Sequence, residues 1–161
     1  YVKEYNFLLN NDKSNVNWYI LRYADVLLMY AEALNEWHHG PNNAALAALN
    51  MVRRRGYGLP YNEANTTVDL KSTSYEGFQE YIRNERAYEL AFEGNRRQDL
   101  IRWGMYYETI VNTYIKLIGW YPEANYVAYQ YTQKNKHELL PIPARDMSLM
   151  ENFKQNQGWG D

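Results

Sequence analysis

Three glutamates in the middle of the sequence have a residue type and a spacing that could do chemistry. Glu85, Glu89 and Glu93 fall four residues apart, which places them on one face of a helix. A pair of carboxyl groups hydrolyses glycosidic bonds when the pKa values of the two groups differ. Arginines before and after these glutamates would instead lower the pKa of every carboxyl group they face. We therefore interpret the set as an Arg–Glu network that ties the third predicted helix to the fourth, and keep glycoside hydrolysis as an alternative.

The remaining side chains that could act in catalysis or bind metal form no recognisable site. His38 and His39 are adjacent, so they point in different directions on a helix, and no third ligand lies near them in the sequence. His137 has no obvious partner. The sequence contains no cysteine, and no triad, phosphate-loop or dinucleotide signature occurs. We predict a protein that is not an enzyme and has no cofactor or metal site, with calcium left open because no EF-hand spacing occurs.

Aromatic residues in predicted loops are the better candidates for function. The sequence contains 17 tyrosines and 5 tryptophans, whose rings combine a flat apolar face with a hydrogen-bonding group. Such rings suit both sugars and protein interfaces. The candidate ligand-binding residues are Trp120, Tyr121, Tyr126, Tyr57 and Tyr61.

The alternative for these rings is that they pack their loops onto the helices. Tyr126, Tyr129 and Tyr131 fit that interpretation, because they recur within a short segment. Trp120 and Tyr121 lie between Gly119 and Pro122, and we expect this pair to be exposed.

Two predicted helices form a hairpin ahead of the first loop. Apolar residues at steps of three and four from Tyr23 to Trp37 predict a helix with its buried stripe on that face, ended by Gly40 and Pro41. The stripe is Tyr23, Leu27, Tyr30, Leu34 and Trp37. Ala24, Leu28 and Ala31 widen it, so we expect this helix to be buried on more than one side. Asn42 or Asn43 would cap a second helix through Arg55, and Gly56 would follow as its C′ residue, a position that is usually left-handed. The hairpin spans roughly 38 residues, near the ~34-residue tetratricopeptide period, and such repeats need about three copies for stability.

The rest of the chain predicts loops between further helices. Residues 56–74 form a long loop, followed by a helix over 75–93 that Gly94 ends. Asn95 and Gln98 suggest a capping box for a fourth helix, with a break at Gly104. The sequence then predicts a loop over 119–136, an extended Leu139–Pro143 segment and a short helix over 144–150. The predicted class is mainly α.

Composition excludes several classes of protein. Hydrophobic residues make up 46% and charged residues 22% of 161 residues, as in globular domains. The net charge of −2 argues against nucleic acid as a partner, and no apolar run is long enough to span a bilayer. The chain begins at Tyr1 without an initiator Met, a signal peptide or an anchor cysteine, so we expect a mature product or a segment of a longer protein.

Several segments, in this order, resemble the SusD/RagB family of nutrient-binding outer-membrane proteins. They are RYADVLLMYAEALN at 22–35, LNMVRRRG at 49–56, the Glu85–Gly104 stretch, LPIP at 140–143 and QNQGW at 155–159. The last departs from the family, with Gln157 where proline is usual and Trp159 where tyrosine is usual.

The resemblance implies a fold, a location and partners. It implies tetratricopeptide-like helical hairpins with long irregular loops, of the α-α superhelix type, with residues 1–161 as the C-terminal helical domain of a longer protein. It further implies a lipoprotein on the outer face of the outer membrane, attached only through a lipid anchor outside this sequence. Such a protein hands glycans to a SusC-like TonB-dependent transporter and is non-catalytic. No binding residue carries over position by position, the cargo could be a peptide, and the alternative is a helical-repeat interaction scaffold whose ligand site lies elsewhere.

Overall fold

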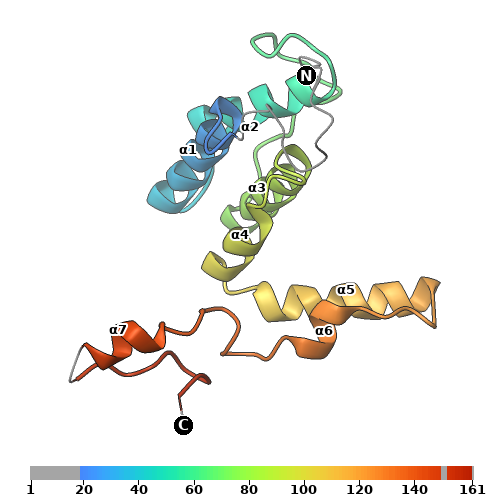
Figure 1. Cartoon of the computed structure of the whole chain (residues 1–161). Helices are drawn as coiled ribbons and strands as arrows, with labels where there is room; N and C mark the ends of the chain where they lie inside the picture. The colour runs from blue at the N-terminus through green and yellow to red at the C-terminus, as the bar shows by residue number, and fades with distance from the viewer. Residues whose placement is uncertain (1–18, 150–151, 161) are drawn as a thin grey trace, which may run out of the picture. The chain divides into compact units, whose positions relative to one another are not determined.

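The structure is a computed structural model that describes residues 19–149 and 152–160. Within these residues the regular structure consists of seven helices and no strands, which confirms the mainly α class (Figure 1). The chain divides into two compact units, one that ends at Ala91 and one that begins at Phe92. Each unit is described by itself.

The first unit is built from three helices, α1 (Tyr23–His38), α2 (Asn43–Gly56) and α3 (Tyr75–Glu89). Helix α1 packs against both α2 and α3. Small residues of α1 and α2 allow close approach of the helices, and larger residues of all three fill the space between them. The buried core consists of Leu28, Ala31, Ala45, Ala48, Leu49, Val52, Phe78 and Ile82.

The two ends of helix α2 agree only in part with the prediction. The Asn42 side chain accepts a hydrogen bond from the Ala45 N–H at 2.8 Å, which confirms it as the cap of α2. Gly56 was predicted to end this helix in a left-handed conformation, and that is wrong, because Gly56 is still helical. Gly58 adopts the left-handed φ of 73° instead. The Leu59 N–H then donates to the Arg54 carbonyl at 2.9 Å and closes the helix.

The predicted buried stripe of α1 is wrong for its aromatic members. Each of them is at least half exposed: Tyr23, Tyr30 and Trp37. The buried face carries Leu28 and Ala31, which were predicted to widen the stripe, together with Asn35, which was not predicted. The Asn35 amide donates to the Tyr75 carbonyl at 3.2 Å, so a polar residue occupies the interface with α3. Because α1 has apolar residues on two faces, its periodicity could not show which face is buried.

Helix α3 is shorter than predicted. It ends at Glu89, and Phe92 and Gly94 both adopt left-handed conformations with φ of 65° and 84°. These conformations end the helix before Glu93. Glu93 therefore does not share the helical face of Glu85 and Glu89.

The second unit contains α4 (Arg96–Arg102), α5 (Tyr106–Trp120), α6 (Val127–Tyr131) and α7 (Ala144–Ser148). Gly104 breaks the chain between α4 and α5 with a φ of 68°, as predicted. The capping box at Asn95 is wrong, because the Asn95 backbone is itself helical and its side chain makes no capping hydrogen bond.

The predicted loop over 119–136 is also partly helical. Helix α5 continues to Trp120, and α6 lies inside the segment. The Tyr129 ring of α6 stacks on the Tyr114 ring of α5, with centroids 4.0 Å apart. This stack supplies the packing that holds α6 against α5.

Residues of the C-terminal tail bind the proline-containing segment that follows α6. The Gln155 side chain accepts from the Ile142 N–H at 2.7 Å and donates to the Ile142 carbonyl at 2.8 Å. The Asn156 amide donates to the Leu140 carbonyl at 2.7 Å. His137, for which the sequence offered no partner, accepts a hydrogen bond at Nδ1 from the Gln133 N–H at 2.8 Å.

Candidate functional site

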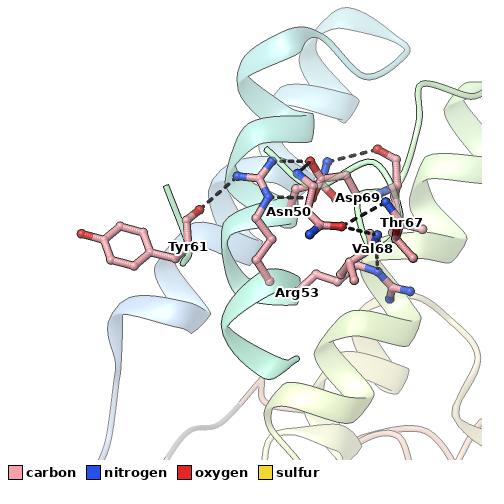
Figure 2. A network of polar contacts seen from close by, with 9 residues as sticks. Asn50, Arg53, Tyr61, Thr67, Val68 and Asp69 are labelled. Carbon is pink, nitrogen blue, oxygen red and sulfur yellow. Dashed lines mark hydrogen bonds and ion pairs between the residues drawn. The ribbon is translucent and has the colours of Figure 1, made fainter. Parts of the chain in front are cut away.

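The loop between α2 and α3 is held by side chains that project from α2 (Figure 2). Asn50 accepts from the Leu70 N–H at 2.8 Å and donates to the Leu70 carbonyl at 3.0 Å. The amide thus satisfies both backbone groups of one loop residue, as a neighbouring strand would. Arg53 adds a hydrogen bond from Nε to the Val68 carbonyl at 2.7 Å.

Arg54 makes the strongest contact in this network. Its Nε and Nη2 donate to the two carboxylate oxygens of Asp69 at 2.6 and 2.5 Å, and its Nη1 donates to the Tyr61 carbonyl at 3.0 Å. The hydrogen bond from Arg54 holds the pKa of the Asp69 carboxyl below its usual range. Asp69 also accepts from the Asn65 N–H at 3.0 Å. The loop is therefore fixed at both halves by one buried guanidinium group.

This network places the two predicted tyrosines of the loop on different surfaces. In Figure 2 the Tyr61 ring points away from the network. Tyr61 lines a cavity of about 510 Å³ with Tyr23 and Leu27 of α1 and Met51 of α2. Tyr57 lies directly after α2, and the Arg53 guanidinium sits over its ring at 5.3 Å from the centroid.

Tyr57 lines a second cleft, of about 720 Å³, between the end of α2 and α3. Its lining combines three tyrosine rings, two arginines and two glutamates with an exposed asparagine, Asn84. The rings are Tyr57, Tyr81 and Tyr88. Sequence reasoning missed Tyr81, Asn84 and Tyr88, although their spacing of three and four residues indicates a single face of α3.

The glutamates of this cleft are held by arginines, which confirms the predicted network for Glu85 and Glu89. Glu85 pairs with Arg53 at 3.1 Å, and Glu89 pairs with Arg55 and, at 2.5 Å, with Arg22. The network differs from the prediction in its partners, because it joins α3 to α2 and to the segment before α1. Burial raises the pKa of the Glu85 carboxyl, and the Arg53 hydrogen bond opposes that rise.

The other three predicted aromatics lie in the second unit. Trp120 ends α5 and Tyr121 follows it, and these residues are 77% and 64% exposed, as expected for this pair. Tyr126 is half-buried at the start of α6. Packing of the segment explains Tyr129, whereas it does not explain Tyr131, which is 71% exposed.

The five predicted residues are divided between the two units. Tyr57 and Tyr61 line separate cavities of the first unit, and Trp120, Tyr121 and Tyr126 belong to the second.

The described residues contain neither a cluster of metal-ligating side chains nor a helix that could span a membrane. His39 adopts a left-handed φ of 49° directly after α1. Across residues 19–149 and 152–160, no three His, Cys, Asp or Glu side chains lie close enough together to bind a metal ion. No helix in these ranges has the length and apolar character needed to cross a bilayer.

Comparison with known proteins identifies the family. The model of the SusD family matches residues 2–159. The chain belongs to the SusD family. The resemblance drawn from the sequence motifs is therefore confirmed.

Relatives within the SusD family agree in sequence and in structure. SusD-like protein P25 of Formosa agariphila is 36% identical over 147 residues, which are 89% of this chain and 25% of that protein. SusD-like protein P2 of the same organism is 30% identical over 91% of this chain and 26% of its own length. The crystal structure of a SusD homolog from Bacteroides thetaiotaomicron superposes with a TM-score of 0.85 at 54% identity, over 96% of this chain and 29% of that one. The chain thus has a SusD-like helical fold and spans about a quarter of the length of these relatives.

Proposed function

We propose that this chain is part of a cell-surface protein that binds oligosaccharides or polysaccharides and delivers them to a SusC-like TonB-dependent transporter. The observation that carries the proposal is the match of residues 2–159 to the SusD family, which is associated with glycan binding in nutrient uptake. In this proposal the protein is held at the outer face of the outer membrane by a lipid anchor outside these residues.

The second unit offers a surface suited to this role. Trp120 and Tyr121 are consecutive in sequence and largely exposed at the end of a helix, so their rings are accessible to the flat faces of sugars. Each such contact contributes about 1 kcal/mol. We expect a dissociation constant on the order of 0.1–1 mM for a short oligosaccharide.

An affinity-gel screen of the intact protein that carries this sequence tests the proposal. Plant, host and microbial polysaccharides are cast into native gels, and retardation by one of them is the expected result. The Trp120→Ala/Tyr121→Ala double variant should lose retardation with little change in melting temperature, because both rings are exposed. Tyr131→Ala removes a similarly exposed ring of the same unit and serves as the matched control. Normal retardation of the double variant would remove these two residues from the site.

The proposed role involves no chemical change of the glycan. Glu89 is paired with arginines, which favour its ionised form rather than a general acid. Burial raises the pKa of the Glu85 carboxyl, but Arg53 binds that carboxyl at 3.1 Å. Incubation of the protein with the retained polysaccharide should release no reducing ends. Sustained release that Glu85→Gln abolishes would contradict the non-catalytic role.

One observation favours a second candidate function, an interaction scaffold whose ligand site lies outside these residues. Tyr23, Tyr30 and Trp37 recur every seven residues on an exposed face of α1, and such a stripe is typical of a helix that contacts another protein segment. Glycan binding by the intact protein together with none by residues 1–161 alone would favour this function.

A further inference from the structure

We propose that the cleft of the first unit, between the end of α2 and α3, is a binding subsite for an uncharged saccharide, built from other residues than Trp120 and Tyr121. The inference rests on the proposed glycan-binding function and adds to it a second location and a ligand class. The cleft measures about 720 Å³, within the range of about 300–1,000 Å³ that is usual for small-molecule sites.

The aromatic part of the cleft supplies faces for sugar rings. Tyr57 and Tyr88 are 62% and 74% exposed, so both rings are accessible to a ligand rather than buried in the core. They approach from different elements, Tyr57 from the end of α2 and Tyr88 from α3, with the half-buried Tyr81 of α3 in the same lining. The apolar face of a pyranose ring can stack on one of these rings while its hydroxyl groups reach polar neighbours.

The polar part of the cleft matches hydroxyl groups, which both donate and accept hydrogen bonds. The carboxylates of Glu85 and Glu89 accept, and the guanidinium of Arg55 and the amide of Asn84 donate. The side chain of Arg55 is 55% exposed while it pairs with Glu89, so it can contact a ligand without leaving its partner.

The charges of the lining select against acidic sugars. Arg53 and Arg55 are balanced by Glu85 and Glu89, and each arginine is paired with one of the glutamates. The additional partner of Glu89, Arg22, lines the neighbouring cavity instead. A uronate or sulfate group would therefore meet the carboxylates of the lining, while the charges of both arginines are already neutralised by them. Like charges at an interface disfavour binding.

The cleft is also held in shape before any ligand arrives. The Tyr57 N–H donates to the carbonyls of Arg53 and Arg54 at 3.1 Å. Leu70, another lining residue, is fixed by both hydrogen bonds of Asn50. A preformed site loses less conformational entropy on binding than a mobile one.

Calorimetric titration of the intact protein tests the subsite. The neutral probes are maltotriose, mannotriose, xylotriose and galactotriose, and the acidic probes are trigalacturonate and a sulfated heparin trisaccharide. We expect at least one neutral probe to bind and the Tyr57→Ala/Tyr88→Ala variant to weaken it at least tenfold. The Tyr57→Phe/Tyr88→Phe variant keeps both ring faces and should bind within about threefold of wild type. Tyr30→Ala, at an exposed ring of α1 outside the cleft, is the matched control.

The outcomes separate this inference from the proposed function. Wild-type affinity in Tyr57→Ala/Tyr88→Ala, together with loss of binding in Trp120→Ala/Tyr121→Ala, would overturn the subsite and leave the glycan-binding function standing. Equal or tighter binding of an acidic probe that also depends on Tyr57 and Tyr88 would overturn the selectivity for uncharged sugars. If the intact protein binds no saccharide either here or in the gel screen, the proposed function fails, and the subsite fails with it.

Discussion

Two irregular segments, one in each unit, are held in place by different means. In the first unit, loop 57–74 is bound through its backbone by Asn50, Arg53 and Arg54 of the preceding helix. In the second unit, segment 121–143 contains a short helix that a tyrosine stack holds, and amides of the C-terminal tail bind its end. The first arrangement uses polar groups on a buried helix face, and the second uses more exposed contacts.

This difference matters for binding. A loop whose carbonyls and N–H groups are bound by a helix can present rings such as Tyr57 and Tyr61 in fixed positions, because its backbone cannot rearrange without breaking several hydrogen bonds. A segment held by one stack and by surface amides opens at a lower cost. We therefore expect the proposed binding surface of the first unit to be more rigid than that of the second.

The largest expected effect is at Arg54. Arg54→Ala removes both hydrogen bonds to Asp69 and the one to the Tyr61 carbonyl, and leaves a carboxylate that is mostly buried without its partner. We expect the free energy of unfolding to fall by about 3 kcal/mol. Urea titration measures it, and limited proteolysis should show new cleavage within 57–74.

Arg54→Lys is the control for this prediction. Lysine keeps the charge and cannot reproduce the two parallel hydrogen bonds, so it should recover only part of the loss. If Arg54→Ala unfolds at the same urea concentration as wild type, the loop does not depend on this network.

The sequence was sufficient for part of this arrangement. Predictions from local sequence features were correct where a single residue type determines the backbone structure, as for the helix cap at Asn42 and the helix break at Gly104. They failed for the aromatic residues of α1, because apolar residues lie on two faces and packing against α3 selects the face with Asn35 as a buried one. The role of Arg54 could not be read from its position, because its partner Asp69 is 15 residues away in a loop without periodicity.

The candidate site shows the same limit. Exposure of Trp120 and Tyr121 followed from their neighbours Gly119 and Pro122, which are local features. The cleft joins Tyr57 with Tyr81 and Tyr88 across more than 20 residues of sequence. That juxtaposition depends on the path of the loop, which the polar network determines.

The next largest effect is expected at the stack of the second unit. Tyr129→Ala removes the ring that lies on Tyr114 at 4.0 Å, and we expect a loss of about 1–2 kcal/mol in the free energy of unfolding. Tyr129→Phe keeps the stack and should remain within about 0.5 kcal/mol of wild type. Thermal unfolding followed by circular dichroism measures both variants. A loss as large as that of Arg54→Ala would remove the proposed difference between the two segments.

A smaller loss of stability is expected when either of two glycines beside a helix is replaced by alanine, and the loss should be equal at the two positions. Gly58 follows α2 and Gly104 precedes α5, with φ of 73° and 68°. A Cβ at either position would meet no atom within 4 Å, so the cost of alanine comes from the backbone alone, about 1 kcal/mol. Gly119→Ala is the control, because this glycine lies within helix α5, and alanine should stabilise it by a few tenths to about 1 kcal/mol. Unequal losses at Gly58 and Gly104 in urea titration would show that one junction carries strain beyond its φ.

The smallest net effect concerns pH, because two carboxyl groups of the first unit act in opposite directions. The pKa of Asp69 is lowered from 3.8 by Arg54, so the stability it contributes is present above 3.8 and is lost as the pH falls through its folded-state pKa. The pKa of Glu85 is raised from 4.5 by burial, so stability falls as the pH rises from 4.5 through its folded-state pKa. Urea titrations at pH 3, 5 and 7 should show that Asp69→Asn reduces the loss between pH 5 and 3, whereas Glu85→Gln reduces the decline above pH 4.5. A Glu85→Gln variant whose stability falls more steeply than that of wild type above pH 4.5 would show that Arg53, rather than burial, dominates at Glu85.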